Sequence, residues 1–231
     1  MEKNYNIETY RRIRRSIGYL GISLPIVLVI FSLIPFFKTD VQTSISEFYF
    51  TNLREIFTGI LCAVGLFLIR YEGFKSSKFW RNDDLLTNIA GFMAVGIAFF
   101  PTNPKVWSQK IYTLIPYDKV FLGWVHYFFA ALFFTILAII SIWVFTIGQN
   151  SSKDLPKSFI DENNIYKTCG IIIFICIGLI FLFSITNWYA YSTLLFEAIA
   201  LFAFGVSWLI KGRALGSRKK LGQKIYREKS L

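Results

Sequence analysis

The chain has 231 residues, of which 55% are hydrophobic and 19% aromatic, and its formal net charge is +11. An ordinary soluble protein is excluded, because roughly a third of the unfolded surface of such a domain stays exposed after folding, and lipid is the solvent that tolerates so much apolar surface. The charge does not indicate a nucleic-acid partner, as it would in a soluble protein, because the basic residues flank apolar stretches, where anionic headgroups of the inner leaflet are the expected partner.

Six apolar stretches predict membrane-spanning helices. The first follows a basic run and is too long for the apolar core of a signal peptide. The second and third are short for a hydrocarbon core of about 30 Å. The predicted fold class is all-α: a transmembrane six-helix bundle over residues 16–213, between a basic cytoplasmic segment at 1–15 and a basic cytoplasmic tail at 214–231. The predicted spans are 16–37, 55–71, 85–100, 120–147, 168–186 and 191–210.

The basic residues set the predicted orientation. On the side of the N-terminus lie 20 of the 25 Lys and Arg residues. The remaining 5 are Lys38, Arg54, Lys105, Lys110 and Lys119. Short cytoplasmic loops are rich in Lys and Arg, so both termini are expected in the cytoplasm, which requires an even number of spans. The tail sequence RKKLGQKIYREKSL is expected to lie along the anionic inner leaflet, or else only to enforce this topology.

Few side chains are suited to metal chemistry. Cys62, Cys169 and Cys176 all fall within apolar stretches, where a cysteine behaves as a small hydrophobic residue. The single histidine, His126, excludes any metal site that needs several histidines. We therefore expect no metal and no cofactor.

Small residues four apart allow close helix packing in membranes. The pattern predicts such seams at Gly59–Ala63 and along Ala90, Ala94 and Ala98.

Almost every polar or ionisable side chain within the predicted membrane region lies toward the outer face. Glu197 and His126 each sit six residues into a span that enters from outside, about 10 Å deep at about 1.5 Å per residue. A charged group at membrane depth costs about 2.5 kcal/mol or more unless it faces protein or water. We therefore expect an outward-facing polar pocket that binds a lipid headgroup or a small polar ligand. Its candidate residues are Ser46, Glu47, Glu55, His126 and Glu197.

The sharpest expectation is that Glu197 and His126 face each other, with Glu55 or Glu47 above them, because each is the other's best available partner at that depth. Structural interpretations stand beside this one. Glu197 and His126 would then be hydrogen-bond links between helices, Glu55 an acid at a helix N-terminus, and Ser46 and Glu47 parts of a capped loop.

Three function classes remain open. The leading one is a non-catalytic membrane protein that binds a ligand. A membrane-embedded lipid hydrolase or transferase would use Ser46 or Ser44 as nucleophile, His126 as base and Glu197 as orienting group, although no G-x-S-x-G motif surrounds either serine. A small transporter is the third, although the inner halves of the spans carry no matching charges.

Five sequence blocks carry a resemblance over Thr43 to Gly212, namely SISEFYF, REIFTGILCAVGLFLIRYEGF, NIAGFMAVGIAFFPTN, VHYFFAALFF and FEAIALFAFGVSWLIKG. In these blocks the chain resembles a family of uncharacterised bacterial six-span membrane proteins, and more distantly the damage-regulated autophagy modulators and the Frag/Sfk proteins. Those relatives share a Ser-acid segment after span one, an acid opening span two, a His near the start of span four and a Glu in span six. These features correspond here to Ser46, Glu47, Glu55, His126 and Glu197.

The resemblance implies six helices in the bacterial cytoplasmic (inner) membrane, with cytoplasmic ends, and it implies no established reaction. The distant relatives are linked to lipid handling and membrane trafficking. The three-histidine zinc hydrolases of membranes differ, because His126 is the single histidine here.

Overall fold

The computed structural model describes residues 2–104, 111–147, 160–186, 189–216 and 220–226. Within these ranges the regular structure is helical and contains no strand. The all-α fold class predicted from the sequence is therefore confirmed. Ser108 and Ser151, in two of the predicted loops, lie outside the described residues.

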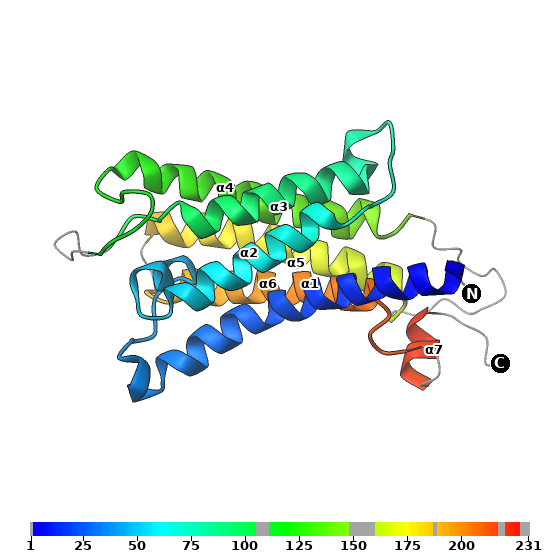
Figure 1. Ribbon diagram of the computed structural model, residues 1–231, viewed down its shortest axis with the longest axis horizontal. Coiled ribbons are helices and arrows are strands. Elements are labelled where there is room, and N and C mark those ends of the chain that lie inside the picture. The colour runs from blue at the N-terminus through cyan, green and yellow to red at the C-terminus, as the bar shows by residue number, and fades with distance from the viewer. Residues whose placement is uncertain (1, 105–110, 148–159, 187–188, 217–219, 227–231) are drawn as a thin grey trace.

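Six long helices form the bundle, and a short helix follows it (Figure 1). Their bounds are α1 Glu2–Ser32, α2 Arg54–Arg70, α3 Asp83–Phe99, α4 Val120–Ile139, α5 Glu162–Thr186, α6 Ser192–Lys211 and α7 Lys220–Tyr226. Helix α4 continues into one turn of π-helix, Ile140–Val144. Three short 3₁₀ turns lie in the connections, at Pro35–Phe37, Ser46–Phe50 and Phe79–Arg81.

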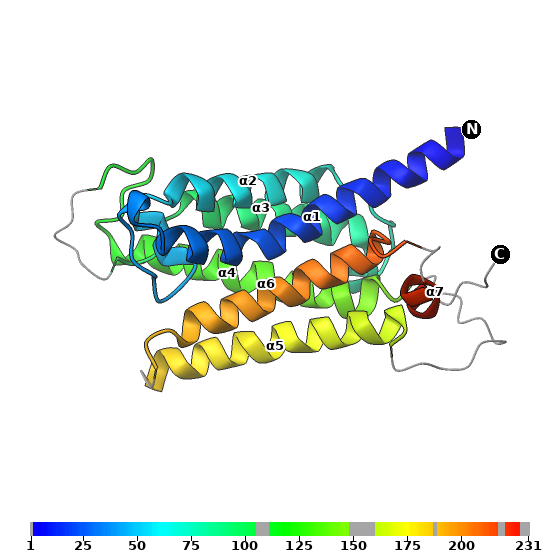
Figure 2. The same cartoon turned by 90° about the horizontal axis from the view of Figure 1, so that it is seen from below.

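The long helices alternate in direction and form a ring in chain order. Each packs against its neighbour in sequence, and α1 closes the ring against α6 (Figures 1 and 2). Both termini consequently lie at the same end of the bundle, together with α7 (Figure 1). We call this the terminal end, and the opposite end, which holds residues 33–53, the loop end.

Four helical stretches within the described residues are long and apolar enough to cross a membrane. They are Ile7–Ser32, Val120–Val144, Glu162–Thr186 and Ser192–Lys211. Helices α2 and α3 have 17 residues each and are therefore about 26 Å long, a little less than a hydrocarbon core of about 30 Å. Of the six predicted spans, four therefore correspond to helices of membrane length within the described residues.

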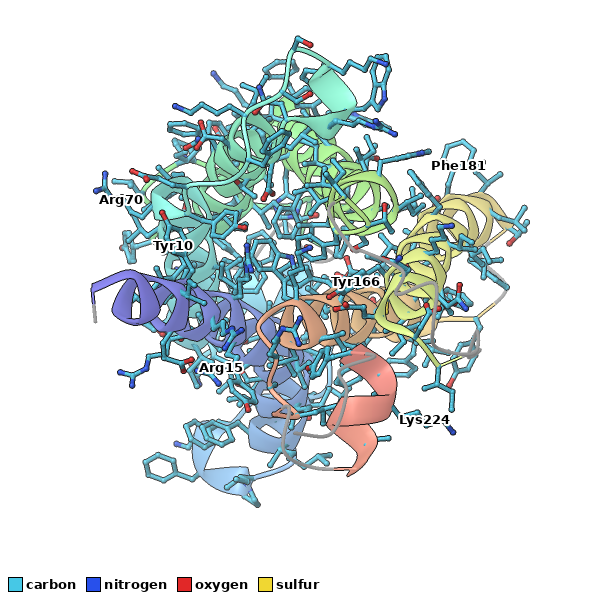
Figure 3. All side chains as sticks on the ribbon, turned by 90° about the vertical axis from the view of Figure 1, so that its right-hand side faces the viewer. Tyr10, Arg15, Arg70, Tyr166, Phe181 and Lys224 are labelled. Carbon is cyan, nitrogen blue, oxygen red and sulfur yellow. The ribbon has the colours of Figure 1, made fainter. Side chains whose placement is uncertain are left out.

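The outward faces of the bundle carry large apolar side chains. Leu66 of α2, Phe92 of α3 and Phe128 of α4 are each 60% exposed. On α5, Phe181 is 68% exposed and lies on the outer side of the helix (Figure 3). Exposed apolar surface on this scale is found where a protein meets lipid or a partner.

Glycines set the closest helix contacts. A Cβ added at Gly65 of α2 would lie 2.8 Å from the Gly91 carbonyl oxygen of α3, and one added at Gly205 of α6 would lie 2.7 Å from the Gly18 carbonyl oxygen of α1. Only a residue without a side chain permits such approach. The predicted alanine seam on α3 is fully buried, whereas the predicted seam at Gly59 is wrong, since a Cβ there would meet nothing within 4 Å.

The predicted N-terminal segment and tail are both partly helical. Helix α1 begins at Glu2, so Arg11 and Arg14 are on the same helix as the first span. Helix α7 lies in the predicted tail, and its Ile225 and Tyr226 are buried, with the Arg213 guanidinium 4.7 Å from the centre of the Tyr226 ring.

Candidate functional site

Residues 43–53 fold into the loop end of the bundle instead of remaining a surface loop. Ile45, Phe48 and Leu53 are almost fully buried. The segment is fixed to α6 by a bond from the Leu194 amide to the Thr43 carbonyl oxygen, at 2.9 Å. The structure therefore places the predicted Ser-acid segment among the helices, where its polar atoms need partners.

Ser46 and His126 are hydrogen-bonded. His126 is fully buried, with Nδ1 2.7 Å from the Phe100 carbonyl oxygen and Nε2 2.9 Å from the Ser46 hydroxyl. A carbonyl oxygen can only accept, so Nδ1 carries a proton and donates it. In the neutral imidazole, Nε2 then accepts from Ser46. The histidine thereby joins α4 to the end of α3 and to residues 43–53.

Glu197 is bonded to the same segment from α6. Its Oε2 accepts a hydrogen bond of 2.6 Å from the Ile45 amide. The expected direct pair of Glu197 and His126 is not formed, because both His126 ring nitrogens are bonded to other groups. The physical reason is that backbone and side-chain atoms of residues 45 and 46 lie between the two helices and bond each of them separately.

The other two predicted residues are placed differently. Glu47 turns back on its own loop, and its Oε2 accepts from the Thr43 amide at 3.0 Å and from the Thr43 hydroxyl at 2.7 Å. Glu55 lies in the first turn of α2 with 77% of its side chain exposed, 3.6 Å from the Arg54 guanidinium. Glu55 therefore does not join Ser46, His126 and Glu197, and its position is the helix N-terminus that favours an acid.

A small cavity lies in the middle of the bundle, directly beneath this segment. Its volume is about 30 Å³, enough for one or two waters, since one water needs about 10–15 Å³. Its walls are apolar except for Ser46 and Glu197. The lining residues are Leu24, Ile45, Ser46, Phe57, Leu61, Ile97, Ala130, Phe133, Phe134, Glu197 and Leu201. His126 is absent from this lining and reaches the cavity only through Ser46.

A second and much larger cavity lies at the terminal end. Its volume is about 320 Å³, which falls in the range of about 300–1,000 Å³ typical of small-molecule sites. Four of its seven lining side chains are cationic and one is acidic. The lining residues are Ile7, Tyr10, Arg11, Arg14, Glu162, Lys211 and Arg213. Figure 3 looks onto this end, with Tyr10 marking α1 and Tyr166 marking α5.

Two of these cations are held in place by buried groups behind the cavity. Arg14 donates two hydrogen bonds to the Tyr71 hydroxyl, at 3.2 and 2.7 Å, and Tyr71 donates to Asp83 at 3.0 Å. Lys211 donates to the Phe145 carbonyl oxygen at 2.7 Å.

Sequence reasoning treated these cations as topology signals and as general partners of anionic headgroups, and did not predict that they line one cavity. A positional signal was present: Arg11 and Arg14 precede Gly18 and Gly21 at helical spacing, and those glycines face α6. The two arginines therefore share the inward stripe of α1. Lys211 similarly follows the fully buried Trp208 by three residues.

No family model matches the chain, and no curated protein or solved structure matches it either. The described residues contain no group of three or more His, Cys, Asp and Glu side chains that could hold a metal ion.

Proposed function

We propose that this chain is a six-span integral membrane protein of a bacterial inner membrane, with both ends in the cytoplasm. Four helices of membrane length, with α2 and α3 packed between them in the same ring, support the six spans. The termini share one end of the bundle, and the side of the N-terminus carries 20 of the 25 basic residues, which supports the orientation. The loop end then faces outward.

Its proposed function is to bind a lipid or a small polar ligand at the outer cavity. The observation that carries this is the convergence of Ser46 and Glu197 on a cavity whose other walls are apolar. Ligand sites have this composition, with apolar walls and a few polar groups that fix orientation. The volume of about 30 Å³ fits one hydroxyl or amide group, so the rest of the ligand would lie between the helices.

Native mass spectrometry of gently purified protein tests this proposal. We expect a co-purifying lipid on the wild-type chain and its loss in Glu197→Gln, which keeps an oxygen to accept from Ile45 but removes the charge. Glu55→Gln is the matched control, because it removes an acid at the same end that lies outside the cavity. Equal lipid retention in both variants would overturn the proposal.

A second candidate function, a lipid hydrolase or transferase, is favoured by one observation. The Ser46 hydroxyl lies 2.9 Å from His126 Nε2, and Phe100 holds the ring from its other side. Ser46 Oγ would attack an ester carbonyl as Nε2 takes its proton, and the same proton would pass to the departing alcohol as the ester C–O bond breaks. The acyl group left on Ser46 would then be transferred to water or to a second alcohol. An active-site-directed phosphonate should then label Ser46 and fail to label Ser46→Ala. Wild-type protein that resists the phosphonate in lipid nanodiscs would exclude this reaction.

A further inference from the structure

The cavity at the terminal end is independent of the outer cavity, and the two share no lining residue. We propose that it is a binding site for a phosphate-bearing anion, supplied either by the headgroup of an anionic lipid or by a soluble phosphate compound. Four cations and one carboxylate line a space large enough for such a group.

The first step of the argument is charge. Arg11, Arg14, Lys211 and Arg213 come together from the start of α1 and the end of α6. Cations gathered around a partly dry space repel one another unless an anion lies between them. The one acid in the lining, Glu162, is bonded to the Tyr166 hydroxyl at 3.2 Å.

The carboxylates nearby offset the charge of the four cations only in part. Asp83 lies behind the cavity and accepts from the Tyr71 hydroxyl. Glu8 is 3.9 Å from Arg11, and it also pairs with Arg12 and Arg15, so one carboxylate is shared among three arginines. The terminal-end cavity therefore keeps an excess of positive charge.

The second step is preorganisation. Arg14 is fixed by the Tyr71 hydroxyl, and Lys211 by the Phe145 carbonyl oxygen and by the Phe145 and Tyr166 rings, which lie 5.3 and 5.5 Å from its ammonium. A guanidinium has five N–H donors and an ammonium three, so each keeps donors beyond those bonds. Side chains already held in place lose less entropy when they bind a ligand.

The third step is location. The terminal-end cavity is lined by residues of α1, of α5 and of the end of α6. These parts of the three helices all lie toward the terminal end of the bundle (Figure 2). With the orientation proposed above, this is the level of the inner-leaflet headgroups. Basic pockets between helices at that level are suited to anionic phospholipid headgroups. Arginine and lysine together bind phosphate oxygens through charge-assisted hydrogen bonds.

The test uses the full chain in nanodiscs of phosphatidylcholine. Phosphatidylglycerol is added in one arm and inorganic phosphate in the other, and binding is measured by native mass spectrometry. Arg11→Gln and Lys211→Gln should each weaken binding about tenfold, the effect of one lost charge-assisted hydrogen bond. Lys211→Arg should restore binding, because arginine keeps a positive charge at the cavity.

Arg12→Gln is the matched control. Arg12 neighbours Arg11, pairs with the same Glu8 and has a side chain that is 76% exposed, but it does not line the cavity. The expected pattern is weaker binding in Arg11→Gln and Lys211→Gln and unchanged binding in Arg12→Gln. If phosphatidylglycerol shows this pattern, the ligand is a lipid headgroup, and if inorganic phosphate shows it, the ligand is a soluble anion. Binding in neither arm, or equal weakening by Arg12→Gln, would overturn the proposal.

Discussion

The two bonds that hold residues 43–53 at the loop end can be broken separately. Glu197→Leu removes the acceptor for the Ile45 amide, and Ser46→Ala removes the donor to His126 Nε2. Ile45 is 4% exposed and His126 0%, so water cannot replace either partner without rearrangement. A buried polar group left without its partner costs about 1–3 kcal/mol, which is the loss of unfolding free energy expected for each variant.

The two losses should not add. Both bonds fix adjacent residues of one segment. Once the first bond is broken the segment is already partly loosened, so breaking the second lowers the unfolding free energy by less than it would alone. We expect the double variant to fall short of the sum by about 0.5–3 kcal/mol, the range found for residues that share a network. Urea or detergent unfolding of the wild type, the two single variants and the double variant measures the four free energies of this double-mutant cycle. The unfolding free energy of Glu197→Gln should lie near that of the wild type.

A second readout distinguishes a loosened segment from general instability. Ser44 is buried at the same place, so a cysteine at Ser44, in a chain whose three native cysteines are replaced, should react slowly with a thiol reagent. Glu197→Leu should speed this reaction, while a cysteine at Ser207, which is 0% exposed against 9% for Ser44, stays protected. Full additivity in the cycle, together with unchanged protection at Ser44, would refute the reasoning.

Three further predictions concern packing, topology and the tail. Gly205→Leu should destabilise the bundle by about 1–3 kcal/mol, because its Cβ would meet the α1 backbone, while Gly59→Ala should not lower the unfolding free energy. An impermeant thiol reagent should label intact cells at a cysteine placed at Ser108 but not at Ser151, and labelling at Ser151 would contradict the proposed orientation. A peptide of sequence RKKLGQKIYREKSL should bind anionic vesicles at low salt, and a peptide that stays free would mean that the tail only enforces topology.

The helical class and the approximate place of each helix could be predicted because apolar runs and basic flanks are local features of the sequence. The closest helix contacts could not be predicted from the sequence. Gly65, Gly91 and Gly205 look like Gly59 in a sequence of this composition, and only the rotation of each helix in the ring decides which glycine meets a backbone. That rotation depends on all six helices at once.

In the candidate site, too, some features could be predicted from the local sequence and others could not. The depth of His126 and Glu197 follows from their place in the helices, and Ser46 does lie beside His126. Their exact partners depended on residues 43–53 folding inward, which the mixture of polar and apolar residues in that short segment did not predict. Because the backbone of that segment brought its own donors into the bundle, it displaced the side-chain pair that depth alone favoured.

The polar groups at the two ends of the bundle differ in how many of their hydrogen bonds already hold the fold together and in how much space they leave for a ligand. At the loop end, Ser46 is bonded to His126 and Glu197 is bonded to the Ile45 amide, and the cavity that Ser46 and Glu197 line has a volume of about 30 Å³. A ligand there must compete with bonds that also hold the fold together. At the terminal end Arg14 and Lys211 have partners behind them and a cavity of about 320 Å³ in front of them, so an anion can bind these two cations without breaking the bonds that hold them. Binding at the terminal end should therefore stabilise the folded chain by its full affinity, whereas binding at the loop end stabilises it only by the excess over the bonds it replaces.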